Sequence, residues 1–209
     1  MALPMVHLAV AHEFARRKGE LLADGSYYLG AIAPDAVHMR KNYERQHKAA
    51  SHFTLNKSRE ADLKVWIADA LANYDATSHD SFSLGYVIHV LTDVLWTDGE
   101  GGMIFDSYAQ DPAPVQKQME AYYNDTDVID LLLYHKEPWR KDVFGAMEHA
   151  AAAAFGELVT MEECDAWRKR TIRWYSEHEI SSYQPLRYTS LEKIYSFIQE
   201  AAEQIAEII

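Results

Sequence analysis

A histidine and an aspartate stand four residues apart in the segment SLGYVIHVLTDVLW, at His89 and Asp93. This spacing places both side chains on one face of an α-helix. The segment is apolar on nearly every side, which predicts a deeply buried helix. Burying an imidazole and a carboxylate is costly unless both groups are satisfied. A divalent metal ion would satisfy both, and a hydrogen-bonded His–Asp pair without metal explains the motif equally well.

Two further polar residues stand where apolar segments begin or end. Asp35 follows Pro34 in the segment GAIAPD, and we expect the proline to stop the buried segment there. His52 lies in the segment ASHFTL, where the chain returns from a polar stretch to apolar residues. Taken singly, Asp35 is typical of an ordinary turn aspartate, and His52 of an ordinary helix-end histidine.

The first helix, predicted over residues 4–18, carries both His7 and His12. Helical geometry separates these two side chains by about 140° around the axis. His7 shares a face with Phe14, whereas His12 shares a face with Arg16. We therefore expect His7 to point into the core and His12 to be solvated, which makes His7 the better candidate for a metal ligand.

Together these segments supply three imidazoles and two carboxylates at the edges of apolar segments. Neutral imidazole and carboxylate without thiolate form the ligand set of catalytic zinc and related divalent ions. Cys164 is the only cysteine, so a cysteine-based zinc knuckle and an intramolecular disulfide are both excluded. Asp35 is also the best candidate to orient or deprotonate an attacking water. The candidate metal ligands are His7, Asp35, His52, His89 and Asp93.

The same segments carry a family resemblance. In chain order, PMVHLAVA, YYLGAIAPDAVH, SHF and FSLGYVIHVLTDVLW resemble motifs of the zinc-dependent phospholipase C superfamily, which includes the fungal single-strand nucleases. The resemblance covers about residues 4–96. It implies an all-helical fold, metal ligation by the five candidate residues and hydrolysis of a phosphoester.

The chain departs from that superfamily after the segment with His89 and Asp93. Its enzymes with three metal ions have a further histidine and a His-x-x-x-Glu pair there, and no histidine of this chain is followed by glutamate four residues later. We therefore expect one nearly complete zinc site and a second, partial one, so that one or two ions bind. His135, His149 or His178, or else water, would have to complete the second site.

Apolar residues recur at helical spacing almost throughout the chain, and no segment shows sustained strand-like alternation. We predict a single domain over residues 1–209, a bundle of about seven to nine helices with the ligand motifs in 4–96 and a helical extension over 103–209. Capping boxes predict one helix from Thr160 to near Tyr183 and a last helix that begins after Thr189. The other predicted segments are residues 26–33, 58–74 with Ser58 as its cap, 81–96, about 115–123, 127–134 and 139–155.

The formal net charge of -12 repels polyanions, so broad nucleic-acid binding is not expected. A small phosphorylated substrate is compatible with this negative charge, because a bound divalent cation reverses the local electrostatic field. We interpret the basic residues Arg40, Lys41, Arg45 and Lys48 as a solvated face rather than a phosphate site. The lack of a long apolar run and of a signal peptide predicts a cytoplasmic location without a membrane span. The oligomeric state is not indicated.

Two functions follow from these observations. The first is a metal-dependent hydrolase that uses metal-activated water, with the phosphoester substrate implied by the resemblance. The second is a non-catalytic helical protein whose metal site is structural or sensory. An open coordination position would favour the first function, and a closed set of protein ligands would favour the second.

Overall fold

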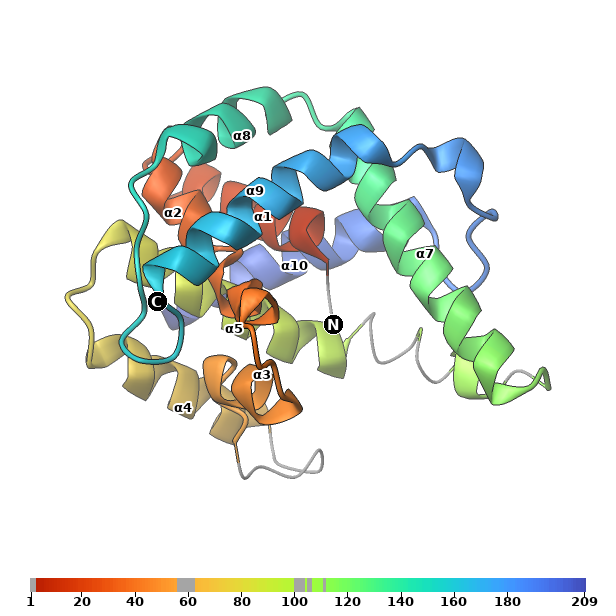
Figure 1. The fold of residues 1–209 in the computed structure, drawn as a ribbon, viewed down its shortest axis with the longest axis horizontal. Helices are drawn as coiled ribbons and strands as arrows, with labels where there is room; N and C mark the ends of the chain where they lie inside the picture. Colours follow the sequence, from red (N-terminus) through yellow and green to blue (C-terminus); the bar gives the residue numbers. More distant parts are fainter. Residues whose placement is uncertain (1–2, 56–62, 100–103, 105–106, 111) are drawn as a thin grey trace.

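The computed structural model describes residues 3–55, 63–99, 104, 107–110 and 112–209, which fold almost entirely into helices (Figure 1). The all-helical prediction is confirmed, and the described residues form nine α-helices and two 3-10 helices. None of the described helices is long and apolar enough to cross a membrane. The elements are α1 (Pro4–Lys18), α2 (Gly25–Gly30), η1 (Ala33–Met39), α3 (Arg45–Ser51), α4 (Leu63–Asp75), α5 (Ser81–Asp98), α7 (Val115–Lys136), α8 (Arg140–His149), α9 (Met161–Glu177), η2 (Ile180–Ser182) and α10 (Leu191–Ile208).

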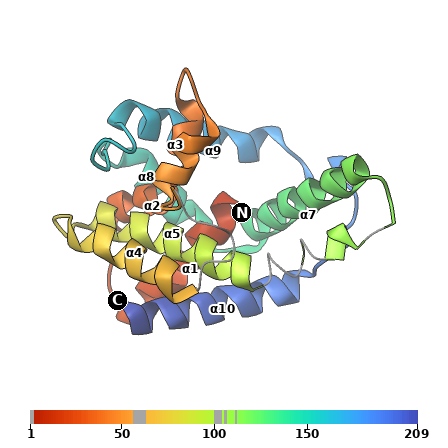
Figure 2. The same ribbon diagram turned by 90° about the horizontal axis from the view of Figure 1, so that it is seen from below.

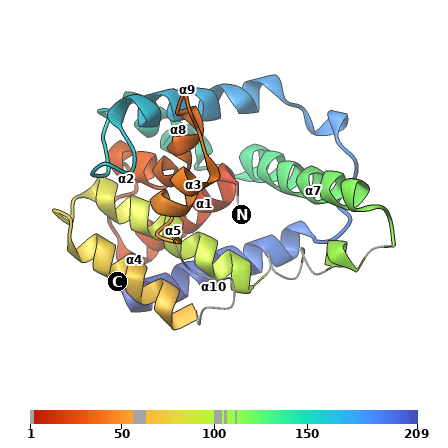
Figure 3. The same ribbon diagram turned by 60° about the horizontal axis from the view of Figure 1, so that its bottom comes forward.

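Helix α5 is the central element of the fold. The Asp80 side chain caps its first turn by accepting a hydrogen bond from the backbone N–H of Ser83 at 2.8 Å. Most of the helix is buried, because it packs against α1, α2, α4 and α10. In Figure 2, α4 and α5 run side by side above α10, and Figure 3 shows α7 extending to one side of this core.

Two glycines let α2 and α5 meet backbone to backbone. A Cβ atom on Gly30 would lie 2.1 Å from the carbonyl oxygen of Phe82, and one on Gly85 would lie 2.0 Å from that of Tyr27. No side chain larger than hydrogen fits at such a distance, so both positions require glycine. The close approach brings the end of α2 against the middle of α5, where His89 lies.

Helix α1 spans the residues that the sequence predicts. Pro4 occupies its first turn, and Gly19 ends it with a left-handed φ of 75°. The start of the helix is anchored by Asp130 of α7, which accepts a hydrogen bond from the backbone N–H of Met5 at 3.0 Å. Tyr175 of α9 donates its hydroxyl to the other oxygen of Asp130. His7 lies two residues after Met5 on the same helix, so this hydrogen bond helps to fix the position of His7 in the core.

The helices of the C-terminal half differ from their predicted bounds. The predicted segments 115–123 and 127–134 are one continuous helix, α7, because no proline or glycine separates them. The predicted helix 139–155 ends at His149, because the guanidinium of Arg168 binds the backbone carbonyls of Met147 and Ala150 at 3.2 and 2.6 Å. The helix predicted to end near Tyr183 ends at Glu177.

Helix caps agree with the predictions in one case and differ in another. Thr160 and Glu163 form the predicted capping box of α9. The last helix begins one residue later than predicted, since Ser190 rather than Thr189 accepts the capping hydrogen bond. The predicted cap Ser58 lies outside the described residues, and its helix is described from Leu63 onward.

Candidate metal centre

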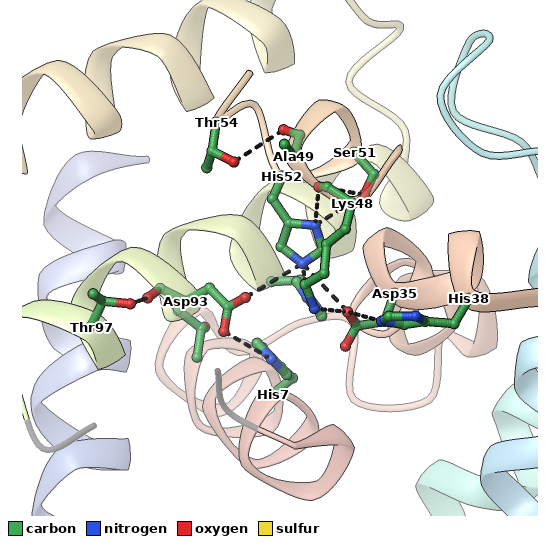
Figure 4. A network of polar contacts seen from close by, with 12 residues as sticks. His7, Asp35, His38, Lys48, Ala49, Ser51, His52, Thr54, Asp93 and Thr97 are labelled. Atoms are coloured by element: carbon green, nitrogen blue, oxygen red, sulfur yellow. Dashed lines mark hydrogen bonds and ion pairs between the residues drawn. The ribbon is translucent and has the colours of Figure 1, made fainter. Parts of the chain in front are cut away.

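The five predicted ligands lie together in one buried cluster. His7 comes from α1, Asp35 from the first turn of η1, His52 from the end of α3, and the last two from α5. Figure 4 shows the side chains of His7, Asp35, His52 and Asp93 turned toward one another. His7 and His89 are fully buried, and only Asp93 retains appreciable exposure, at 17% of its side chain.

The Nε2 atom of His52 has three candidate ligand atoms close to it. The Nε2 atom of His52 lies 3.3 Å from His89 Nε2, 3.5 Å from Asp35 Oδ1 and 3.4 Å from Asp93 Oδ2. Ligands about 2.0–2.1 Å from a tetrahedral zinc ion are separated by about 3.3–3.4 Å along each tetrahedron edge. The three distances from His52 Nε2 are therefore close to these edge lengths. Among the described residues, the ligand atoms that all lie within 4.8 Å of one another form two groups of three, which are Asp35, His52 and His89, and His7, His89 and Asp93.

Hydrogen bonds to the backbone set the tautomers of two histidines. His89 donates from Nδ1 to the carbonyl oxygen of Ala31 at 2.8 Å, and His52 donates from Nδ1 to that of Lys48 at 3.0 Å. Because a carbonyl oxygen only accepts, a neutral ring bonded in this way has its hydrogen on Nδ1. The Nδ1 of His52 also lies 3.0 Å from the hydroxyl of Ser51, which itself donates to the Lys48 carbonyl. In these tautomers both Nε2 atoms carry lone pairs, and they lie 3.3 Å apart. Two facing lone pairs repel each other unless a cation lies between them.

His7 is the fifth member of the cluster, and its ring has two polar atoms, Nδ1 and Nε2. It is fully buried, and neither ring nitrogen has a hydrogen-bond partner among the described residues. Its ring stacks on His89 with centroids 3.6 Å apart. Its Nε2 lies 3.5 Å from Asp93 Oδ1, the carboxylate oxygen opposite the one that faces His52. His7 and Asp93 thus form a second group of candidate ligands together with His89.

Burial and mutual charge keep the cluster in the protonation states that metal binding requires. Burial lowers the pKa of His52 to about 3, and it also lowers the pKa values of His7 and His89. Burial alone would raise the pKa of Asp93, but the neighbouring imidazoles outweigh it and lower that pKa to about 2. The pKa of Asp35 is likewise held well below its usual range, with Lys48 as the main opposing charge. Neutral imidazoles and ionised carboxylates result.

Lys48 belongs to the cluster, which corrects its interpretation as part of a solvated face. Its Nζ lies 2.6 Å from Asp35 Oδ1, and 19% of its side chain is exposed. Arg40 is not a free surface cation either, because it forms an ion pair with Glu163 at 2.6 Å. Lys48 precedes His52 by four residues, so the helical spacing of the two was a usable signal.

The other predicted histidines lie elsewhere. His12 is half-buried rather than solvated, since its Nδ1 is 3.0 Å from the hydroxyl of Tyr28 and its ring stacks on Trp139. None of the three C-terminal candidates joins the metal-ligating groups of the described residues. His149 and His178 each bind a carbonyl of their own helix, and His135 is exposed; these are the residues that were expected to complete a second site.

Comparisons with protein-family models, with curated proteins and with solved structures found no match for this chain.

Proposed function

We propose that this chain is a metal-dependent hydrolase of phosphoesters, with zinc as its metal and the buried cluster as its active centre. The observation that carries the proposal is the close approach of the Nε2 atoms of His52 and His89, which lie 3.3 Å apart, with oxygens of Asp35 and Asp93 3.5 and 3.4 Å from His52 Nε2. Imidazole nitrogens and carboxylate oxygens so close together are costly to bury without a cation between them.

A metal-free His–Asp pair accounts for the cluster less well. His89 uses its only N–H to bind the carbonyl of Ala31. Its remaining nitrogen can only accept a hydrogen bond, and the ionised carboxylate of Asp93 can only accept as well. The two residues therefore cannot satisfy each other, whereas a shared cation would satisfy both.

The residues around the centre suit hydrolysis. A divalent ion bound there supplies a Lewis acid that activates water and neutralises charge on a phosphoryl group. Asp35, held ionised, accepts hydrogen bonds and can orient a water, in keeping with its proposed catalytic role. The partly exposed side chains of Asp93, Lys48 and His38 mark the side from which a substrate enters.

The choice of a phosphoester rests on the resemblance to the zinc-dependent phospholipase C superfamily. The glycines of its Gly-x-x-x-Pro-Asp and Gly-Tyr-x-x-His segments, Gly30 and Gly85, here form the close α2–α5 contact. The resemblance therefore includes residues with a structural role as well as the proposed ligands. We propose a phospholipase C-like arrangement on this basis, with a small phosphorylated substrate.

The alternative function, a structural or sensory metal site, is favoured by the enclosure of the imidazoles. The side chains of His7, His52 and His89 are at most about a twentieth exposed, as in closed sites. Turnover separates the two functions, because a closed site binds metal without hydrolysing any phosphoester.

The experiment combines metal content with activity. Protein purified without chelator or metal-affinity steps is analysed for transition metals and then assayed with p-nitrophenyl phosphate and bis-p-nitrophenyl phosphate. We expect at least one equivalent of zinc, and we expect His89→Ala and Asp93→Ala to lose both metal and activity. The matched control is His135→Ala, on the exposed face of α7, which should change neither. Metal without turnover would support the structural site, and no metal uptake would refute both functions.

A further inference from the structure

Lys48 places a permanent positive charge at the edge of the proposed metal centre. Its ammonium lies 2.6 Å from Asp35 Oδ1, closer than the Nε2 atoms of His52 and His38, which lie 3.5 and 3.8 Å from the same oxygen. Its side chain reaches the partly exposed side of the site, as Asp93 and His38 do. Figure 4 shows Lys48 extending past His52 toward Asp35.

The charges of the cluster show what this lysine changes. Asp35 and Asp93 contribute two negative charges, and the three imidazoles are neutral. One divalent ion therefore brings the ligand set to neutrality, with no excess charge to attract an anion. Lys48 makes the loaded site positive by one charge. The whole chain carries a formal charge of -12, so an anionic substrate needs such a local attraction.

An ammonium can serve two acceptors at once. It carries three N–H donors, so a hydrogen bond to Asp35 is compatible with one to a substrate oxygen. In a two-metal hydrolase the second ion stabilises the charge of the phosphoryl group. Among the described residues, a second ion has only His7 and Asp93 beside the His89 that the first group also uses, and His135, His149 and His178 do not join them.

We propose that the Lys48 ammonium binds a phosphoryl oxygen of the substrate and supplies the positive charge that a second metal ion would otherwise provide. The inference rests on the proposed function, because it requires the metal centre. Lys48 is then a substrate-binding residue, and its bond with Asp35 holds it in position.

The test measures the binding of inorganic phosphate to the zinc-loaded protein by titration calorimetry, with the metal content of each variant determined in parallel. We expect Lys48→Met to keep its zinc and to bind phosphate about tenfold more weakly or worse. Lys41→Met removes the same charge from an exposed lysine nearby and should bind phosphate as the unmodified protein does. Equal phosphate affinity in all three proteins would overturn the proposal.

A purely structural role for Lys48 predicts a different result. If Lys48→Met lost its zinc, Lys48→Arg would decide, because arginine keeps the charge. Zinc and phosphate binding both restored by arginine would support the proposal, and loss of zinc or of phosphate binding in that variant would overturn it. The proposed function fails separately: a protein that binds zinc and phosphate but hydrolyses no phosphoester leaves the role of Lys48 in anion binding intact.

Discussion

Replacing His7 by phenylalanine should stabilise the metal-free protein, although His7 is a proposed ligand. Both ring nitrogens of His7 are buried without a hydrogen-bond partner among the described residues. Phenylalanine keeps a flat ring that can stack on His89 and removes those polar atoms. An unsatisfied buried polar group costs about 1–3 kcal/mol. The larger ring of phenylalanine offsets part of that stabilisation, so we expect a value in the lower half of this range.

In the melting temperature this gain of about 1–2 kcal/mol corresponds to an increase of about 2–8 °C, since 1 kcal/mol shifts a domain of this size by about 2–4 °C. Thermal denaturation in the presence of a chelator measures it directly. The matched control is His12→Phe, because His12 has a hydrogen-bond partner in Tyr28 and the same substitution breaks that contact. His12→Phe should therefore leave the melting temperature unchanged or lower it.

The same substitution should also change the number of zinc ions that bind. Asp35, His52 and His89 form a group of candidate ligands that does not include His7, so His7→Phe should retain the first equivalent of zinc. A weaker second equivalent, which depends on His7 and Asp93, should be lost. The reasoning would be refuted if His7→Phe melted at a lower temperature than the unmodified protein in chelator, because the His7 nitrogens would then be satisfied in the metal-free state.

The remaining predictions concern pH and the helix contact. The folded-state pKa of His52 is about 3 against 6.5 for an ordinary histidine, so the unfolded chain takes up the proton first as the pH falls. The free energy of unfolding of the chelated protein should therefore decrease as the pH falls from 6.5 to about 3, by about 1.4 kcal/mol per pH unit for this residue. Denaturant titrations at several pH values measure this free energy, and a value that does not change with pH would contradict the prediction. Gly85→Ala should abolish zinc binding and lower stability, because its Cβ would overlap the Tyr27 carbonyl, whereas Gly145→Ala, with open space around it, should be neutral or slightly stabilising. Equal melting temperatures for the two alanine variants would show that the α2–α5 contact is not restrictive.

The cluster of candidate ligands could be predicted because its members stand within or at the edges of local apolar segments. His89 and Asp93 are four residues apart in a buried helix, and Asp35 follows a proline that ends a buried segment. His7 was distinguished from His12 by the apolar face of α1 alone. These signals need no information about distant residues, so the sequence was sufficient to select the residues that the fold brings together.

The bounds of the C-terminal helices could not be predicted in the same way, because contacts with distant residues determine them. The polar residues in the middle of α7 suggested a break, yet Asp125 is buried there and accepts hydrogen bonds from the backbone N–H groups of Arg187 and Tyr188. The five alanines after His149 favour a helix, but Arg168 of α9 binds the last carbonyls of α8 and ends it.

The two glycines of the α2–α5 contact influence the tautomer of His89 through the distance between the two helix backbones. Because Gly30 and Gly85 have no Cβ, the two backbones approach closely enough for the carbonyl of Ala31 to accept from Nδ1 of His89. That hydrogen bond places the ring hydrogen on Nδ1 and leaves the lone pair on Nε2, which faces His52. The glycines therefore act on the proposed metal centre through the tautomer of His89, and a residue with a side chain at either position would misplace the acceptor on which that tautomer depends.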